Sequence, residues 1–124
     1  MSCLFDSLSK FINIDSGRIR NMICDYLEND YKIMEDLDTS LVLALSTHTN
    51  SKDDYIRNMR HTNTWGSAIE IQAACNIWKL RIFVVNKRNN DQIIEFIPVS
   101  KEYNHNIGLI WYGNHYEPAN IVFK

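Results

Sequence analysis

Apolar residues in the first part of the chain recur every three to four positions, which is the spacing of one face of an α-helix. The first such stretch starts at Cys3 and continues to Ile12. A second follows Asp15 and Ser16, whose side chains can cap a first helical turn, and its apolar positions extend to Leu27. The pattern therefore predicts two amphipathic helices at the start of the chain.

Three more helices are expected before residue 79. Residues 38–40 can cap a short apolar helix over 41–45, and residues 50–54 give a polar start to a helix that carries Tyr55, Ile56 and Met59. The segment Ala68 to Trp78 is apolar nearly all the way round its helical circumference, which indicates a buried helix.

The last third of the chain is rich in β-branched and aromatic residues and predicts strands. Four runs are expected, over residues 80–85, 92–99, 107–112 and 115–122, with a polar turn at 87–91 and a two-residue hairpin turn at 113–114. Helices followed by a meander of strands predict the α+β class, with a small and mostly antiparallel sheet.

Length and charge narrow the possible roles. The chain has 124 residues and no repeat or Pro/Gly-rich linker, so we expect one domain over residues 1–124. Its 13 Lys and Arg and 15 Asp and Glu give a formal net charge of −2, which argues against a general nucleic-acid binder. No apolar run approaches the roughly 20 residues that span a bilayer, so no membrane partner is expected.

Cysteine usage and the N-terminus indicate the compartment. Three cysteines at wide spacings do not suggest a disulfide framework, and the N-terminus lacks the pattern of a signal peptide. We therefore expect a monomer in a reducing, intracellular and cytoplasmic setting. The 16 Ile and 14 Asn indicate an AT-rich genome, which favours a virus, acting in the host cytoplasm, or an intracellular microbe.

Cys3 is the first candidate for chemistry. The N–H groups at a helix start have no partner within the helix, and the macrodipole is positive there. Both effects favour the thiolate, which is the nucleophilic form of cysteine. The alternative is a small core residue that happens to lie near the terminus.

His115 and Glu117 form the second candidate. His115 directly follows the expected turn, and residues i and i+2 of a strand point to the same face, so the two side chains should be neighbours. A carboxylate beside an imidazole fixes its tautomer and stabilises the imidazolium. The alternative is a surface histidine at a hairpin.

The other histidines and cysteines are expected to play no part in chemistry. His48, His61 and His105 lie in polar stretches without metal-ligand spacing, so no metal or other cofactor is implied. Cys24 lies on the apolar face of its helix and Cys75 lies in the buried helix, where both serve packing.

The order of these motifs resembles that of the ovarian tumour (OTU) cysteine proteases. Cys3-Leu4-Phe5 looks like the Cys box of that family, whose usual form is Asp-Gly-x-Cys-Leu-Phe. Three further segments match in order, namely Tyr55 to Met59, Trp65-Gly66 with residues 70–73, and the strand at 82–85. Residues 107–110 followed by His115-Tyr116-Glu117 look like its terminal His box. The resemblance extends from Cys3 to about residue 122.

The resemblance implies a papain-like OTU fold and hydrolysis of isopeptide bonds to ubiquitin or a ubiquitin-like modifier. Cys3 would then be the nucleophile and His115 the general base. Glu117 stands where the family often has Asp or Asn to orient the histidine, with Asn114 as the other candidate for that role.

One position departs from the family pattern. Met1 stands where the family has the Gly of the Cys box, and the preceding Asp position falls before residue 1. Because that segment shapes the oxyanion hole in the family, we expect a trimmed chain or an atypical member with weak activity. The main alternative function is a domain that binds ubiquitin without cleaving it. A small α+β module unrelated to ubiquitin is a further alternative.

Overall fold

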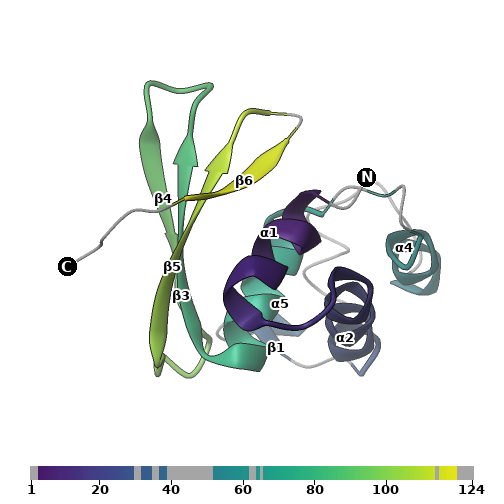
Figure 1. Ribbon diagram of the computed structural model, residues 1–124. Helices are drawn as coiled ribbons and strands as arrows, with labels where there is room; N and C mark the ends of the chain where they lie inside the picture. Colours follow the sequence, from purple (N-terminus) through teal and green to yellow (C-terminus); the bar gives the residue numbers. More distant parts are fainter. Residues whose placement is uncertain are drawn as a thin grey trace.

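Helices pack on one side of a four-stranded sheet (Figure 1). The computed structural model describes residues 3–29, 32–34, 37–38, 52–61, 64, 66–113 and 115–119. The helices are α1 (Cys3–Ile12), α2 (Ser16–Glu28), α4 (Lys52–Met59) and α5 (Ala68–Trp78). The strands are β1 (Lys32–Met34), β2 (Leu37–Asp38), β3 (Leu80–Asn86), β4 (Gln92–Phe96), β5 (His105–Trp111) and β6 (Tyr116–Ala119). Within these residues, no helix is long and apolar enough to cross a membrane.

The first two helices begin where the sequence pattern predicts. α1 starts at Cys3 and ends before Asn13, which takes the left-handed conformation at φ 64° that Asn tolerates better than most residues. Asp15 caps α2, because its carboxylate accepts a hydrogen bond from the Gly17 N–H at 3.1 Å. Ile19 and Ile23 of α2 are fully buried against the core.

α5 forms the centre of the helical layer, as its apolar sequence predicts. Its residues contact α2, β1, β3 and β4. The helix ends at Lys79, whose left-handed backbone at φ 55° lets its N–H bond to the Cys75 carbonyl and turns the chain into β3. The prediction for residues 68–78 is therefore confirmed.

The sheet has the order β4-β3-β5-β6, so the prediction of a simple meander is wrong. β5 pairs in parallel with β3, from Leu80 opposite His105 to Asn86 opposite Trp111. The other two pairings are antiparallel. β3 and β5 contain the longest runs of buried residues, and placing them together in the middle keeps those runs from water, whereas β4 is exposed at the edge.

Two smaller differences have local causes. β4 ends at Phe96 and not at Val99, since Pro98 has no N–H to continue a ladder. The antiparallel pair of β1 and β2 was not predicted from the sequence, and both strands are very short. The helix expected over residues 41–45 lies outside the described residues.

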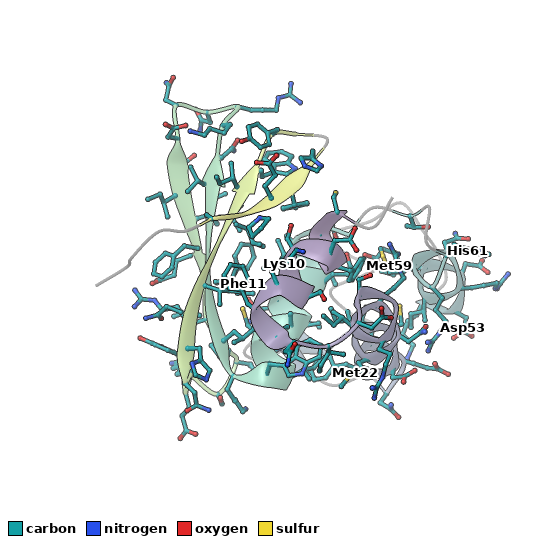
Figure 2. The ribbon with its side chains drawn as sticks, viewed as in Figure 1. Lys10, Phe11, Met22, Asp53, Met59 and His61 are labelled. Carbon is teal, nitrogen blue, oxygen red and sulfur yellow. The ribbon has the colours of Figure 1, made fainter. Side chains whose placement is uncertain are left out.

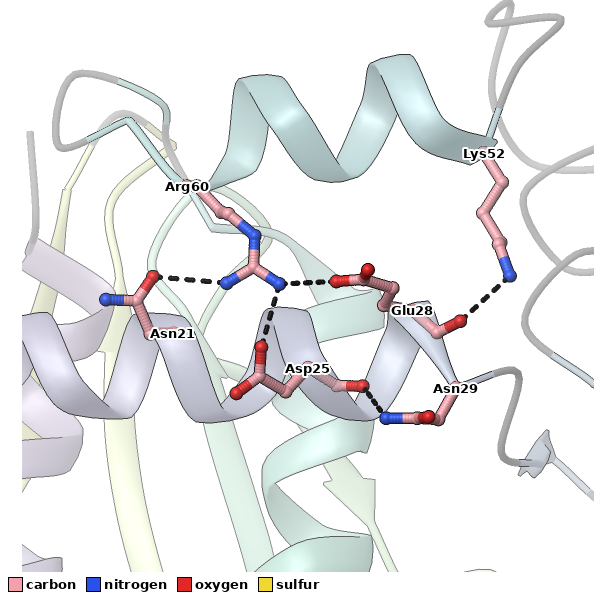
Figure 3. Close-up of polar contacts among 6 residues, drawn as sticks. All are labelled: Asn21, Asp25, Glu28, Asn29, Lys52 and Arg60. Atoms are coloured by element: carbon pink, nitrogen blue, oxygen red, sulfur yellow. Dashed lines mark hydrogen bonds and ion pairs between the residues drawn. The ribbon is translucent and has the colours of Figure 1, made fainter.

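α4 is joined to α2 by polar contacts at the surface (Figure 3). The Arg60 guanidinium donates to Asp25 at 2.8 Å, to Glu28 at 2.7 Å and to Asn21 at 3.3 Å. Met59 is buried on the inner side of α4, while Asp53 and His61 lie on its outer side (Figure 2). Burial of Met59 and the surface hydrogen bonds of Arg60 therefore both hold α4 in place.

The ends of several helices and strands meet at one end of the molecule. The N-terminal ends of α1 and α5 lie at the same end as the C-terminal ends of the parallel strands β3 and β5 (Figure 1). The hairpin ends of the sheet extend beyond the helices there. In sheets with parallel strands, ligands commonly bind outside the carboxyl ends of those strands.

Candidate active site

A cavity of about 320 Å³ opens at this end of the molecule, between the helix starts and the sheet. Its walls are mostly apolar, and its polar groups come from Cys3, Ser67, His115 and Tyr116. The remaining lining residues are Gly66, Ala68, Ile71, Val84, Ile94, Phe96, Trp111 and Gly113. The cavity is thus a largely apolar site with a few converging polar groups, the usual composition of a small ligand or reaction site.

Cys3 reaches the cavity because it is the first residue of α1. Its side chain is partly exposed, whereas the next two residues, Leu4 and Phe5, are buried in the core and hold the helix start in place. The Cys3 carbonyl accepts a hydrogen bond from the Ser7 hydroxyl at 2.8 Å. The thiol is therefore accessible but attached to a rigid element.

His115 lines the same cavity from the opposite end of the chain. Its Nε2 lies 3.5 Å from Glu117 Oε1, so the prediction that these two side chains are neighbours is confirmed. This separation suits an ion pair when the imidazole is protonated, although it is longer than a normal hydrogen bond. Asn114, the alternative orienting residue, lies outside the described part of the chain.

Tyr112 contacts both His115 and Glu117, and the sequence did not predict this role for it. Its ring stacks on His115 with centroids 6.2 Å apart, and its hydroxyl donates to Glu117 Oε2 at 3.2 Å. Partial desolvation and the Glu117 carboxylate raise the pKa of Tyr112, so the hydroxyl keeps the proton that it donates. The Tyr112 N–H also bonds to the His115 carbonyl at 2.9 Å and closes the hairpin. The hairpin brings Tyr112 back beside His115, and this contact has no counterpart in a local sequence pattern.

Tyr116 forms a second wall that sequence reasoning did not single out. It is opposite Trp111 in the antiparallel pair, and both side chains line the cavity. Burial, followed by the nearby Cys3 and Glu70, raises the pKa of Tyr116 to about 12. Strand alternation alone would place Tyr116 on the opposite face from His115, so the sequence pattern contained no signal that both residues line the cavity.

Gly66 is a point of close approach between the cavity wall and α1. A Cβ at Gly66 would lie 2.3 Å from Leu4 Cδ2, and Leu4 is buried beside Cys3. We expect Gly66→Ala to cost about 1–3 kcal/mol of unfolding free energy, because Leu4 must move within a packed core. Urea denaturation will measure the loss. Gly17→Ala is the matched control, since its Cβ would meet only the exposed Asp15 carboxylate at 3.1 Å. Equal free energies of unfolding for the two variants would show that Gly66 is not packed tightly against Leu4 of α1.

The other two cysteines are remote from this chemistry. Cys24 and Cys75 are fully buried, and burial raises the pKa of the Cys24 thiol to about 11 and that of Cys75 to about 12. Both therefore remain protonated at neutral pH, in agreement with a packing role. His61 and His105 are exposed, and His105 lies at the opposite end of β5 from the cavity. His48 lies outside the described residues.

These differences predict selective labelling of the native protein. Iodoacetamide at neutral pH should add one carbamidomethyl group, at Cys3, because the other two thiols are buried and protonated. Intact-mass measurement with peptide mapping checks this, and labelling in denaturant should give three groups. Rapid native labelling at Cys24 or Cys75 would contradict the packing described above.

The described residues offer no resident metal site. Nowhere among them do three or more His, Cys, Asp or Glu side chains gather in a way that could hold a metal ion. The cavity itself presents the Cys3 thiol and the His115 imidazole, and Glu117 lies beside that imidazole.

The sequence of this chain is similar to those of known proteins. The sequence pattern of the OTU-like cysteine proteases matches residues 2–117. "Ubiquitin thioesterase otu2" of Schizosaccharomyces pombe is 28% identical over 117 residues, which cover 90% of this chain and 37% of that protein. The chain thus spans little more than a third of the length of this relative.

Solved structures show the same fold. An ovarian tumour domain in complex with ubiquitin superimposes with a TM-score of 0.72 at 22% identity, covering 94% of this chain and 62% of that one. An OTU deubiquitinase from Wolbachia pipientis wMel, bound to ubiquitin, gives a TM-score of 0.66 at 18% identity over 94% of this chain and 88% of that one. The α+β class and the papain-like OTU architecture predicted from the sequence are therefore confirmed.

Proposed function

Because the chain belongs to the family of OTU-like cysteine proteases, we propose that it is a thiol-dependent hydrolase that removes ubiquitin or a ubiquitin-like modifier from conjugates. The observation that carries the proposal is that Cys3 and His115 line one cavity, with Glu117 3.5 Å from the imidazole. The named activity of the fission-yeast relative and the ubiquitin complexes of the two OTU structures support ubiquitin as the partner.

The first step forms a thioester. Cys3 Sγ attacks the carbonyl carbon at the C-terminal glycine of ubiquitin, and its proton passes to His115. Since His115 Nε2 faces Glu117, Nδ1 is the nitrogen that accepts this proton. The imidazolium is then stabilised by the Glu117 carboxylate and gives the proton to the departing lysine amine as the C–N bond breaks.

The second step releases ubiquitin. His115 takes a proton from a water molecule, the resulting hydroxide attacks the thioester carbon, and the C–S bond breaks as Cys3 regains a proton. The mostly apolar walls, including Val84, Ile94 and Trp111, leave Cys3, Ser67, His115 and Tyr116 as the polar side chains that face the reacting groups. No metal or organic cofactor takes part in either step.

The same proposal covers the setting of the reaction. Residues 1–124 would act as one catalytic domain and as a monomer. A reducing compartment suits the mechanism, because Cys3 must remain a free thiol between turnovers.

Hydrolysis of ubiquitin carrying a C-terminal fluorogenic amide tests this proposal, together with titration of ubiquitin binding by calorimetry. We expect saturable release of the fluorophore. Binding without turnover would assign the chain to the alternative class of domains that hold ubiquitin without cutting it. The absence of both would exclude ubiquitin as the partner.

A further inference from the structure

Glu70 is a carboxylate with no exposed surface, located at the third position of α5 and beneath the cavity. Its Oε1 accepts hydrogen bonds from the Ser67 N–H at 2.7 Å and the Ser67 hydroxyl at 2.6 Å. Its Oε2 accepts one from the Tyr55 hydroxyl of α4 at 2.7 Å. The two oxygens of one side chain therefore hold two different parts of the molecule.

The surroundings of Glu70 offset part of the cost of burying its carboxyl group. Burial raises the pKa of Glu70, and the hydrogen bonds from Ser67 and Tyr55 reduce this rise without reversing it. The buried guanidinium of Arg20 is close enough for the two charges to interact. Arg20 is itself held by the Met59 carbonyl at 2.6 Å and lies 4.2 Å from the centre of the Phe5 ring. Breaking such a buried arrangement is costly, so these groups hold α1, α2, α4 and α5 firmly together.

The Oε1 side of Glu70 leads to Cys3 through direct contacts. Ser67, which it holds, lines the cavity together with Gly66. Gly66 lies so close to Leu4 that no Cβ fits between them, and Leu4 is bonded to Cys3. The Oε2 side leads away from the cavity, to α4, which contacts α2 on the far side of the helical layer.

We propose that Glu70 is a positioning residue for the hydrolase reaction, in which Oε1 fixes the 66–67 wall against the Cys3 end of α1 and Oε2 only anchors α4. This inference rests on the proposed function. Glu70 does not touch the substrate, so it acts on the geometry of the reacting groups. A displacement of about 1 Å at a reacting group can cost on the order of a hundredfold in rate.

The two sides of the carboxylate make the inference testable with matched variants. Glu70→Ala should lower kcat about ten- to a hundredfold with KM changed less than about threefold, since Glu70 is fully buried and does not touch the modifier. Glu70→Gln should recover most of the loss, because its amide oxygen can still accept from Ser67. Ser67→Ala should lower kcat about three- to tenfold, and Tyr55→Phe should leave kcat within about twofold while lowering Tm.

The experiment is steady-state kinetics on the fluorogenic ubiquitin substrate, at a temperature where circular dichroism shows all variants folded. If Glu70→Ala does not fold, the comparison of Ser67→Ala with Tyr55→Phe decides. Equal kcat losses in those two variants, or losses that follow Tm alone, would overturn the inference while leaving the hydrolase proposal intact. A wild-type protein that binds ubiquitin without turnover would overturn both.

Discussion

Replacing Cys3 by alanine is expected to abolish hydrolysis of ubiquitin conjugates and to leave ubiquitin binding intact. The substitution removes the proposed nucleophile, and no neighbouring thiol can replace it because Cys24 and Cys75 are buried. Loss of a nucleophile of this kind lowers kcat by at least about a thousandfold. Cys3 is only partly buried, so its truncation should open no core cavity and should change Tm little. Kinetics, calorimetric binding and thermal unfolding of the same sample measure all three quantities.

Cys24→Ala is the matched control for this prediction. It also removes a thiol, but from the buried face of α2, so it should reduce stability while kcat remains near that of the wild type. Turnover that persists in Cys3→Ala would place the nucleophile elsewhere. The same conclusion would follow if Cys24→Ala, still folded, lost activity to the same extent.

His115→Ala is expected to produce the second-largest loss, about a hundred- to ten-thousandfold in kcat/KM, because no other imidazole or carboxylate among the described residues lines the cavity to accept the thiol proton. Glu117→Ala should cost less, since a carboxylate 3.5 Å from Nε2 orients the ring without transferring the proton. Glu117→Gln should lie between Glu117→Ala and the wild type, because an amide oxygen can still accept from Nε2. Kinetics of the three variants on one fluorogenic substrate give this order.

Tyr112→Phe separates the two contacts that Glu117 makes. It keeps the ring beside His115 and removes only the hydroxyl that donates to Glu117 Oε2, so a small loss of kcat/KM is expected.

Wild-type kcat/KM in Glu117→Ala would mean that another residue holds the imidazole, with Asn114 as the next candidate. A larger loss in Glu117→Ala than in His115→Ala would contradict the assignment of the base.

The helices could be predicted closely because their signals are local. α5 matches its predicted bounds, since Ser67 precedes an apolar run and the chain turns at Lys79 into β-branched residues. α1 and α2 carry their apolar faces, and α2 also its Asp15 cap, within the sequence itself. The order of the sheet was not predictable in this way, because the parallel pairing of β3 with β5 depends on burial of both strands by distant elements.

The candidate site was predictable to a smaller extent. The order of the motifs indicated Cys3 and His115, and strand alternation indicated the contact between His115 and Glu117. Tyr112 and Glu70 were missed as functional groups for different reasons. The contact of Tyr112 with His115 arises from the hairpin that joins β5 and β6. The role we assign to Glu70 depends on three hydrogen-bond donors, namely the N–H and the hydroxyl of Ser67 and the hydroxyl of Tyr55 in α4.

The most direct measurement is capture by ubiquitin that carries an electrophile at its C-terminus, followed by peptide mapping. We expect a covalent adduct of one ubiquitin per chain, located at Cys3, and no adduct in the Cys3→Ala variant. The adduct should form more slowly in His115→Ala, because the thiol then lacks its base. Tight binding without an adduct, or an adduct at Cys24 or Cys75, would contradict the assignment of Cys3 as the nucleophile of a ubiquitin hydrolase.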